Sequence, residues 1–162
     1  MNHPIKADSK WSRACLRVFS DILEPEDIGR RLGLTASRSH RKGAPRSSRV
    51  TLTWNESLWS LQSPLSQRHG IADHVQWLLD TLEPKTDSLT ELLKYCRIDL
   101  LCGFSSGNGQ CGVQLDPLVL KRLARLTIPF VIVVLDPNVP GAGPFHHTSQ
   151  DLSGAVGSES IL

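Results

Sequence analysis

The sequence contains no apolar run long enough to cross a membrane as a helix. The longest, FVIVVL at residues 130–135, is far shorter than the roughly 20 residues that a spanning helix needs. The first residues, MNHPIKADSKWSR, also lack the apolar stretch of a secretory signal. We therefore expect a cytoplasmic protein that makes no use of a membrane.

Close-spaced metal ligands are absent as well. The four cysteines lie far apart, and neither a Cys-x-x-Cys nor a His-x-x-x-His pattern occurs. Structural zinc sites depend on such spacing. We expect no metal, no other cofactor, and free buried thiols at Cys15, Cys96, Cys102 and Cys111.

Signatures of phosphate binding and nucleophilic catalysis are also missing. The glycines of GFSSGNG, residues 103–109, are followed by neither a lysine nor a helix, so we predict a hairpin that turns at Asn108-Gly109. No Gly-x-Ser-x-Gly motif is present. His74 has Asp73 and Trp77 nearby, but its place in a predicted helix favours a surface histidine. Nothing in the sequence requires an enzyme, and catalysis is left open.

The composition, 162 residues of which 40% are hydrophobic, fits one globular domain. We assign that domain to residues 13–136. Residues 1–12 are expected to form a flexible leader. Residues 137–162, rich in Gly, Pro and Ser, are expected to form a disordered tail.

Apolar periodicity and capping residues predict the elements of this domain. Helices are predicted from Pro25 to Gly33, over residues 71–82, from Asp87 or Ser88, and from Pro117. Strands are predicted over 13–19, over 50–54 with one buried face, and over 128–136 as a central, well-covered strand.

Two parts of the chain resemble each other. The segments Leu23–Pro25 and Leu115–Pro117 each follow a predicted strand and begin a helix, and an arginine stands five residues after each proline. This echo predicts two βαβ-like halves. The fold class is therefore expected to be α+β, with a mostly antiparallel sheet, helices packed on one face, and ferredoxin-like character.

The charge distribution is uneven. Seven Arg or Lys residues and no acid lie from Arg30 to Arg49, and His40 is the only aromatic residue in that stretch. Three interpretations remain: a solvated loop, a protein-binding surface, or a phosphate-contacting nucleic-acid surface. The candidate binding residues are Arg38, Ser39, His40, Arg41, Lys42, Arg46 and Trp59.

Several stretches, taken in order, resemble a bacterial family of unknown function, DUF4279. They are FSDILEPEDIGRRLGL, SRSHRKG, WSLQS, HVQWLLDTLEP and LDPLVLKRLARL, which together extend from Phe19 to the strand that ends near Asp136. The resemblance implies a bacterial protein in which the segment Ser39–Gly43 is a recurrent feature. It implies no activity, cofactor or catalytic residue.

These observations favour a protein-binding module, for example one that acts like an immunity protein or an inhibitor. The alternative is a nucleic-acid-binding accessory domain that uses the basic loop, residues 38–49. The identity of the partner and the oligomeric state stay open.

Overall fold

A computed structural model describes residues 11–47, 50–105 and 112–134. The main sheet has the strand order β2 (Arg38–His40), β5 (Ser57–Gln62), β1 (Trp11–Ser20), β6 (Arg97–Ser105) and β7 (Phe130–Val134). Neighbouring strands are antiparallel, except that β6 and β7 are parallel. The mostly antiparallel sheet that the sequence predicts is therefore confirmed.

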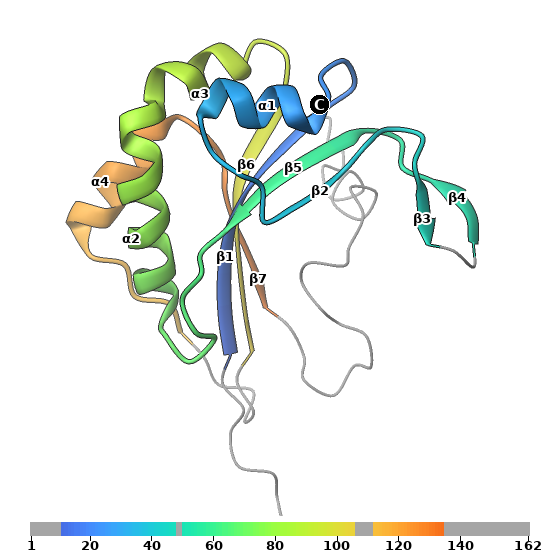
Figure 1. The fold of residues 1–162 in the computed structure, drawn as a ribbon. Helices are drawn as coiled ribbons and strands as arrows, with labels where there is room; N and C mark the ends of the chain where they lie inside the picture. Colours follow the sequence, from blue (N-terminus) through green and yellow to red (C-terminus); the bar gives the residue numbers. More distant parts are fainter. Residues whose placement is uncertain (1–10, 48–49, 106–111, 135–162) are drawn as a thin grey trace, which may run out of the picture.

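Helices cover one face of this sheet (Figure 1). They are α1 (Pro25–Leu32), α2 (Ile71–Leu82), α3 (Thr86–Leu92) and α4 (Pro117–Leu126). A short 3-10 helix, Glu83–Lys85, joins α2 directly to α3. The arrangement confirms the α+β class and the packing of helices on one face.

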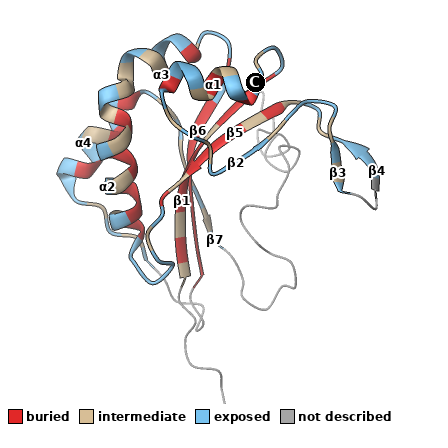
Figure 2. Ribbon diagram, in the orientation of Figure 1, coloured by how far each residue is buried: buried red, intermediate tan, exposed pale blue. Residues whose placement is uncertain are grey.

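The core lies between the helices and the sheet, as the buried positions in Figure 2 show. Alternate residues of β1 and β6 point toward the helices because side chains alternate along a strand. The predicted stripe of α2 packs against them. Residues in this core that are no more than 2% exposed include Ala14, Leu16, Val18, Val75, Leu78, Leu79, Leu82, Ile98, Leu100 and Cys102.

The capping predictions for α1 and α4 are confirmed. Pro25 and Pro117 occupy the first turn of their helices, where a missing N–H leaves no bond unmade. Asp116 caps α4 by accepting a hydrogen bond of 2.8 Å from the Leu118 N–H. Gly33 ends α1 in the left-handed conformation, at φ 63°, which glycine adopts without strain.

The two βαβ-like halves differ in how their strands are placed. In the second half, α4 connects β6 to the parallel strand beside it, β7. In the first half, β1 and β2 are each antiparallel to β5, which lies between them, so they run parallel to each other. The two similar segments therefore belong to units that differ in one respect. In the first unit β5 lies between the two parallel strands, and in the second the two parallel strands are direct neighbours.

Several local predictions are wrong. The strand β7 is an edge strand of the described sheet rather than a central one, and its Val134 is 63% exposed. Residues 112–116 form no strand, so the part of the predicted hairpin that follows the turn is not formed there, while Asn108-Gly109 lies outside the described residues. The residue before α3 is Lys85, because the chain is already helical at the predicted caps Asp87 and Ser88.

The predicted leader, residues 1–12, and the predicted tail, residues 137–162, lie mostly outside the described residues. The strand β1 begins at Trp11, so two residues of the predicted leader, Trp11 and Ser12, belong to the sheet. Residues 1–10 and the predicted tail, residues 137–162, are not described.

The histidine of α2 is also not where the sequence suggests. His74 is buried, with 0% of its surface exposed. It lies three residues after Ile71 and four before Leu78, on the apolar stripe of the helix. Its Nδ1 is 3.0 Å from the Ser63 hydroxyl, whereas its buried Nε2 has no hydrogen-bond partner among the described residues.

Candidate functional site

Six of the seven predicted site residues follow one another along the β2 edge of the molecule. Arg38, Ser39 and His40 form β2 itself, Arg41 and Lys42 follow it, and Arg46 lies in β3 (Pro45–Ser47). The seventh residue, Trp59, lies in β5 opposite Ser39. Its side chain is buried, with 1% exposed.

Beyond β2 the chain leaves the main sheet and forms a projecting arm, residues 41–47 and 50–56. The strands β3 (Pro45–Ser47) and β4 (Val50–Thr53) pair antiparallel within it. In Figure 1 this pair extends sideways from the body of the molecule. Thr51 and Thr53 are exposed, and Leu52 is 59% exposed, so Leu52 does not lie on a buried face as the alternation predicts.

Backbone hydrogen bonds fix the base of the arm. The Gly43 N–H donates to the Trp54 carbonyl at 2.7 Å, and the Trp54 N–H donates to the Ala44 carbonyl at 3.0 Å. Gly43 has φ 79°, a conformation that other residues rarely adopt. The Lys42 N–H donates to the buried Ser57 hydroxyl at 3.0 Å and so ties the arm to β5.

An aromatic and cationic cluster forms where the arm meets the sheet. The rings of His40 and Trp54 stack, with centroids 3.8 Å apart and planes 12° apart. The Arg46 guanidinium lies over the indole of Trp54, 4.9 Å from its centroid. Arg46 also donates through Nε to the Thr53 carbonyl at 3.1 Å, which holds the guanidinium over the ring. We call His40, Trp54 and Arg46 the stacked cluster.

The electrostatics of the cluster follow from this packing. Burial, and secondarily the positive charge of Arg38, lower the pKa of His40 to about 4, and Arg46 adds to this effect. Glu56 acts in the opposite direction but is outweighed. At neutral pH the imidazole is therefore uncharged, and Arg46 supplies the cation of the cluster.

Two cations of the basic loop are paired with acids from around the start of α1. Arg41 bridges Glu26 at 2.9 Å and Glu24 at 3.3 Å. Lys42 bridges Asp21 at 2.8 Å. These side chains are at least half exposed, so each pair contributes little stability. The pairs do make this side of the loop a surface of mixed charge rather than a purely basic one.

A groove separates α1 from the β2 edge. Its volume is about 550 Å³, and Ser39 and Trp59 lie in its lining, together with Gly29 and Leu34. A Cβ built on Gly29 would lie 3.0 Å from the Leu34 carbonyl oxygen and 3.1 Å from Nε1 of Trp59. Helix α1 therefore packs directly on Trp59, and Gly29 permits this close approach because it has no Cβ.

Trp54 and Leu52 lie at this site but are not among the seven predicted site residues. The alternation of residues 50–54 predicts a strand that buries them. In the structure the chain bends at Asn55 and Glu56, so β4 and β5 are separate strands with different surroundings. The odd spacing between Trp54 and Trp59 indicates this from the sequence. One straight strand would place the two side chains on opposite faces, so either one of them is exposed or the chain turns near Asn55.

Other kinds of site find no support in the described part of the chain. No group of three or more His, Cys, Asp or Glu side chains there could hold a metal ion. Burial raises the pKa of the Cys15 thiol to about 12, and burial also raises the pKa of Cys102, so neither is a reactive thiolate near neutral pH. None of the helices in the same residues combines the length and apolar character needed to cross a bilayer.

The family comparison matches residues 9–136 to the model described as Domain of unknown function (DUF4279). The chain belongs to this family. The DUF4279 match includes every helix and strand described above, as well as the arm and the groove. No curated protein and no solved structure matches the chain, so the DUF4279 assignment brings no activity with it.

Proposed function

We propose that this DUF4279 protein is a protein-binding module and that the arm, with the stacked cluster at its base, is its contact surface. The observation that carries the proposal is the projecting pair of strands β3 and β4 (Figure 1). This pair carries the exposed Leu52 and has the stacked Trp54 and Arg46 at its base. Tryptophan and arginine are the residues most enriched at the energetic centres of protein interfaces. An exposed leucine beside them adds apolar area.

The rigidity of the arm supports the same proposal. The indole is fixed by His40 on its face and by the guanidinium of Arg46, and the hairpin base is fixed by backbone hydrogen bonds. Side chains that are already ordered lose less entropy when a partner binds. A narrow, ordered projection can also enter a concave surface of another protein, which is the geometry that an inhibitor-like or immunity-like role requires.

A nucleic-acid role is less well supported by the same residues. Arg41 and Lys42 are paired with acids that would lie close to any bound phosphate. With an imidazole stacked on the indole of Trp54 and a guanidinium over it, little ring surface is open for stacking on a base. A cytoplasmic, bacterial setting is part of the proposal. Free thiols at Cys15, Cys96 and Cys102 are typical of a reducing compartment, and the bacterial origin is what the resemblance to DUF4279 implies.

The test is affinity capture from lysate of the producing cells, with and without nuclease, read by mass spectrometry. Three baits are compared: the wild-type chain, an arm variant Arg46→Glu/Leu52→Glu, and a control variant Lys121→Glu/Arg125→Glu on the exposed face of α4. The control carries the same number of substitutions and the larger change in charge, away from the arm.

We expect one protein to be retained in stoichiometric amount by the wild type and the control, with nuclease present, and to be lost with the arm variant. Mixing the purified partner with each bait then measures the affinity directly. Retention of nucleic acid, or of proteins that disappear after nuclease treatment, would overturn the proposal in favour of the nucleic-acid alternative. Capture of the same protein in equal amounts by all three baits would show that the arm is not part of the interface.

A further inference from the structure

A buried hydrogen-bond donor without an acceptor lies at the groove between α1 and the β2 edge. Trp59 is 1% exposed and is part of the lining of this groove. Its Nε1 lies beside Gly29, which lines the same groove, since a Cβ built on that glycine would be 3.1 Å from it. The indole N–H donates no hydrogen bond within the described part of the chain. A buried tryptophan N–H usually has a partner, so this one is available to an acceptor in the groove.

The backbone of β2 supplies further unpaired groups at this sheet edge. The Ser60 carbonyl of β5 points toward β2, because it accepts a hydrogen bond of 2.8 Å from the Ser37 N–H. Backbone groups along an antiparallel strand point alternately to its two neighbours, so those of Trp59 point toward β1, as does the Ser63 N–H, which donates to the β1 backbone at 3.0 Å. Ser39 faces Trp59 across the β2–β5 pair. The N–H and C=O of Ser39 therefore have no partner in β5 and point outward from the edge.

The remaining groups of the groove favour an uncharged chain rather than an ion. Its two charged lining residues are already paired, Glu26 with Arg41 at 2.9 Å and Arg30 with Asp27 at 2.8 Å. The other lining residues are small or aliphatic: Pro25, Gly29, Gly33, Leu34, Thr35 and Ala36. The volume of about 550 Å³ is within the range of ligand-binding sites.

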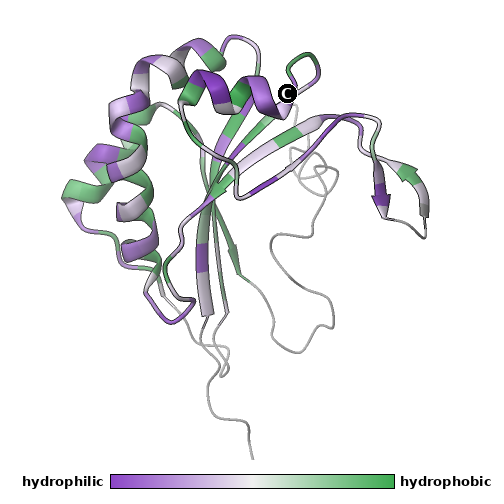
Figure 3. Ribbon diagram, in the orientation of Figure 1, coloured by the Kyte–Doolittle hydropathy of each residue, from purple (hydrophilic) through white to green (hydrophobic). Residues whose placement is uncertain are grey.

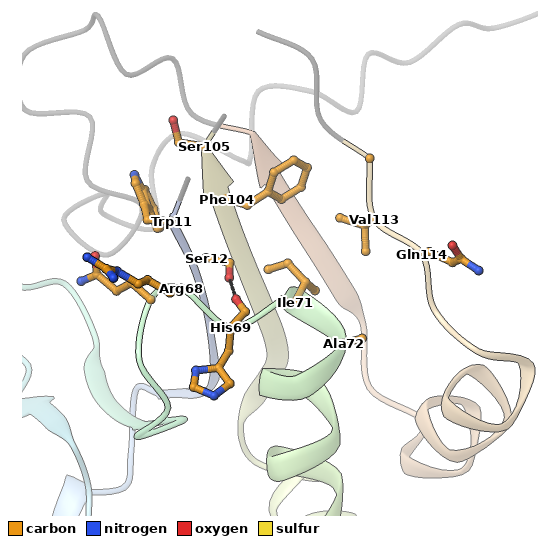
Figure 4. Close-up of a pocket in the computed structure, with 13 residues that line it drawn as sticks. Trp11, Ser12, Arg68, His69, Ile71, Ala72, Phe104, Ser105, Val113 and Gln114 are labelled. Carbon is orange, nitrogen blue, oxygen red and sulfur yellow. Dashed lines mark hydrogen bonds between the residues drawn. The ribbon is translucent and has the colours of Figure 1, made fainter. Parts of the chain in front are cut away.

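The cavity of about 380 Å³ where β1 begins has no comparable group (Figure 4). The Ser12 hydroxyl already donates to the His69 carbonyl, as the dashed line shows. Ser105 pairs with Trp11, and strand alternation places both side chains on the sheet face away from α2. Neither hydroxyl is therefore available within that cavity.

We propose that the groove binds an extended peptide segment of a partner protein, which adds a strand to the edge of the sheet at β2. One peptide residue pairs with the outward N–H and C=O of Ser39, as in strand addition to other sheet edges. Directly opposed side chains lie on the same face of a sheet, so the side chain of that residue enters the groove beside Trp59. We assign it an uncharged amide, Asn or Gln, whose oxygen accepts the hydrogen bond from Nε1.

This site goes beyond the arm and shares no residue with the stacked cluster. The substitutions that test the arm, at Arg46 and Leu52, lie outside the lining of the groove. Failure of the groove proposal therefore leaves the arm proposal standing, and the reverse also holds.

The test selects peptides from a phage-displayed library of random octapeptides on the full chain. The enriched sequence is then synthesised with both ends capped and titrated into the protein by ¹H–¹⁵N NMR. We expect one position of the enriched peptides to be Asn or Gln. Binding should move the Nε1–H signal of Trp59 downfield, because donating a hydrogen bond deshields the proton, while the indole signal of Trp77 in α2 stays in place. The Trp59 signal is assigned by its absence in Trp59→Phe.

Methylation of single peptide amide nitrogens tests the strand pairing. The N–H groups of an added strand point alternately toward and away from β2. N-methylation should therefore weaken binding about fivefold or more at the residue opposite Ser39 and much less at the two residues beside it. Ser39→Pro removes the outward N–H and should also weaken binding about fivefold, whereas Ser39→Ala keeps this N–H and should weaken it less.

Two comparisons test the position of the peptide. Thr35→Trp fills the groove from its exposed side and should abolish binding, while Thr90→Trp, on the exposed side of α3, should leave it unchanged. Replacing the Asn or Gln of the peptide by Leu should weaken binding about fivefold to the wild type and much less to Trp59→Phe, because the two groups act through one hydrogen bond.

Several results would overturn the proposal. They are an absence of enriched peptides, equal binding to folded Thr35→Trp, equal affinity of all N-methylated peptides, and a Trp59 signal that does not move at saturation. A Trp59 Nε1–H that is already downfield and protected from exchange in the free protein would also overturn it, because another segment would then fill the groove.

Discussion

The imidazole of His40 lies flat against the indole of Trp54, with ring centroids 3.8 Å apart. His40 is the last residue of β2 in the main sheet, and Trp54 follows β4 of the arm. The stack is therefore the point at which the arm is fixed to the domain. Its strength can be followed through the titration of His40.

The pKa of His40 is expected at about 4, well below the usual value of a histidine, because the ring is partly buried and Arg38 and Arg46 lie nearby. Trp54→Ala removes the ring that covers the imidazole, so the pKa should rise toward about 6.5. The measurement is an NMR titration of the His40 ring protons in both proteins. A wild-type pKa close to that of an exposed histidine would contradict the buried stack.

The buried His74 predicts a loss of stability in mild acid. Burial lowers its pKa, with a smaller contribution from His69, and Asp73 opposes the shift. Because the folded pKa is depressed, the unfolded chain binds a proton below about pH 6.5 that the folded chain resists. The contribution of His74 is thus present at neutral pH and is lost as the pH falls below that value. Urea unfolding between about pH 7.5 and pH 5.5 measures it.

The variant His74→Gln tests this assignment. Its unfolding free energy should depend less steeply on pH than that of the wild type, by up to about 1.4 kcal/mol per pH unit for one proton. His40→Gln is the matched comparison, because the pKa of His40 is also lowered by burial. The double variant should have the smallest slope. An unchanged slope in His74→Gln would show that the buried ring does not resist protonation.

Local signals in the sequence were sufficient to predict α1, α2 and α4, but not the start of α3. The prolines that begin α1 and α4, the cap at Gly33 and the apolar stripe of α2 depend on residues within a few turns of each other. The position of β7 could not be predicted in the same way. An unbroken apolar run is typical of a central strand, but strand order depends on pairing between distant segments, and here β7 is the last strand beside β6.

The candidate site was predicted in part. The basic stretch includes β2 and β3, but charge alone could not show that Arg41 and Lys42 are paired with acids from around the start of α1. His74 shows the reverse case. The spacing of His74 from Ile71 and Leu78 places it on the apolar stripe of α2, where it is buried. It was predicted to lie on the surface because its side chain is polar. Figure 3 shows the same limit for β7, which is hydrophobic along its length although it lies at an edge.

Gly29 is expected to be a site where alanine lowers stability despite its higher helix propensity. Alanine in place of glycine inside a helix normally gains about 1 kcal/mol. Here the added Cβ would lie 3.0 Å from the Leu34 carbonyl oxygen and 3.1 Å from Nε1 of Trp59, so α1 must shift. We expect Gly29→Ala to lower the unfolding free energy by about 1 kcal/mol, measured in urea.

A double-mutant cycle with Trp59→Phe separates the contact from the effect of the helix. The phenyl ring lacks Nε1, so Gly29→Ala should cost less in the Trp59→Phe background than in the wild type. If Gly29→Ala instead raises stability in the wild type, the close approach of α1 to Trp59 is not a constraint on the sequence.

The ion pair between Arg17 and Asp99 predicts the largest single effect on stability. Both bonds of the bidentate pair are 2.7 Å, and the side chains are 13% and 8% exposed. Asp99→Asn leaves the guanidinium of Arg17 without its counter-charge in a buried site, so we expect a loss of about 3 kcal/mol in urea unfolding. Arg30→Gln, which breaks the exposed pair with Asp27, is the control and should change stability by less than about 1 kcal/mol.

Replacing both buried partners, as Arg17→Met/Asp99→Leu, should recover most of the loss, because no unpaired charge remains buried. A similar small effect for Asp99→Asn and Arg30→Gln would mean that water reaches the pair, and that this face of β1 and β6 is open to solvent.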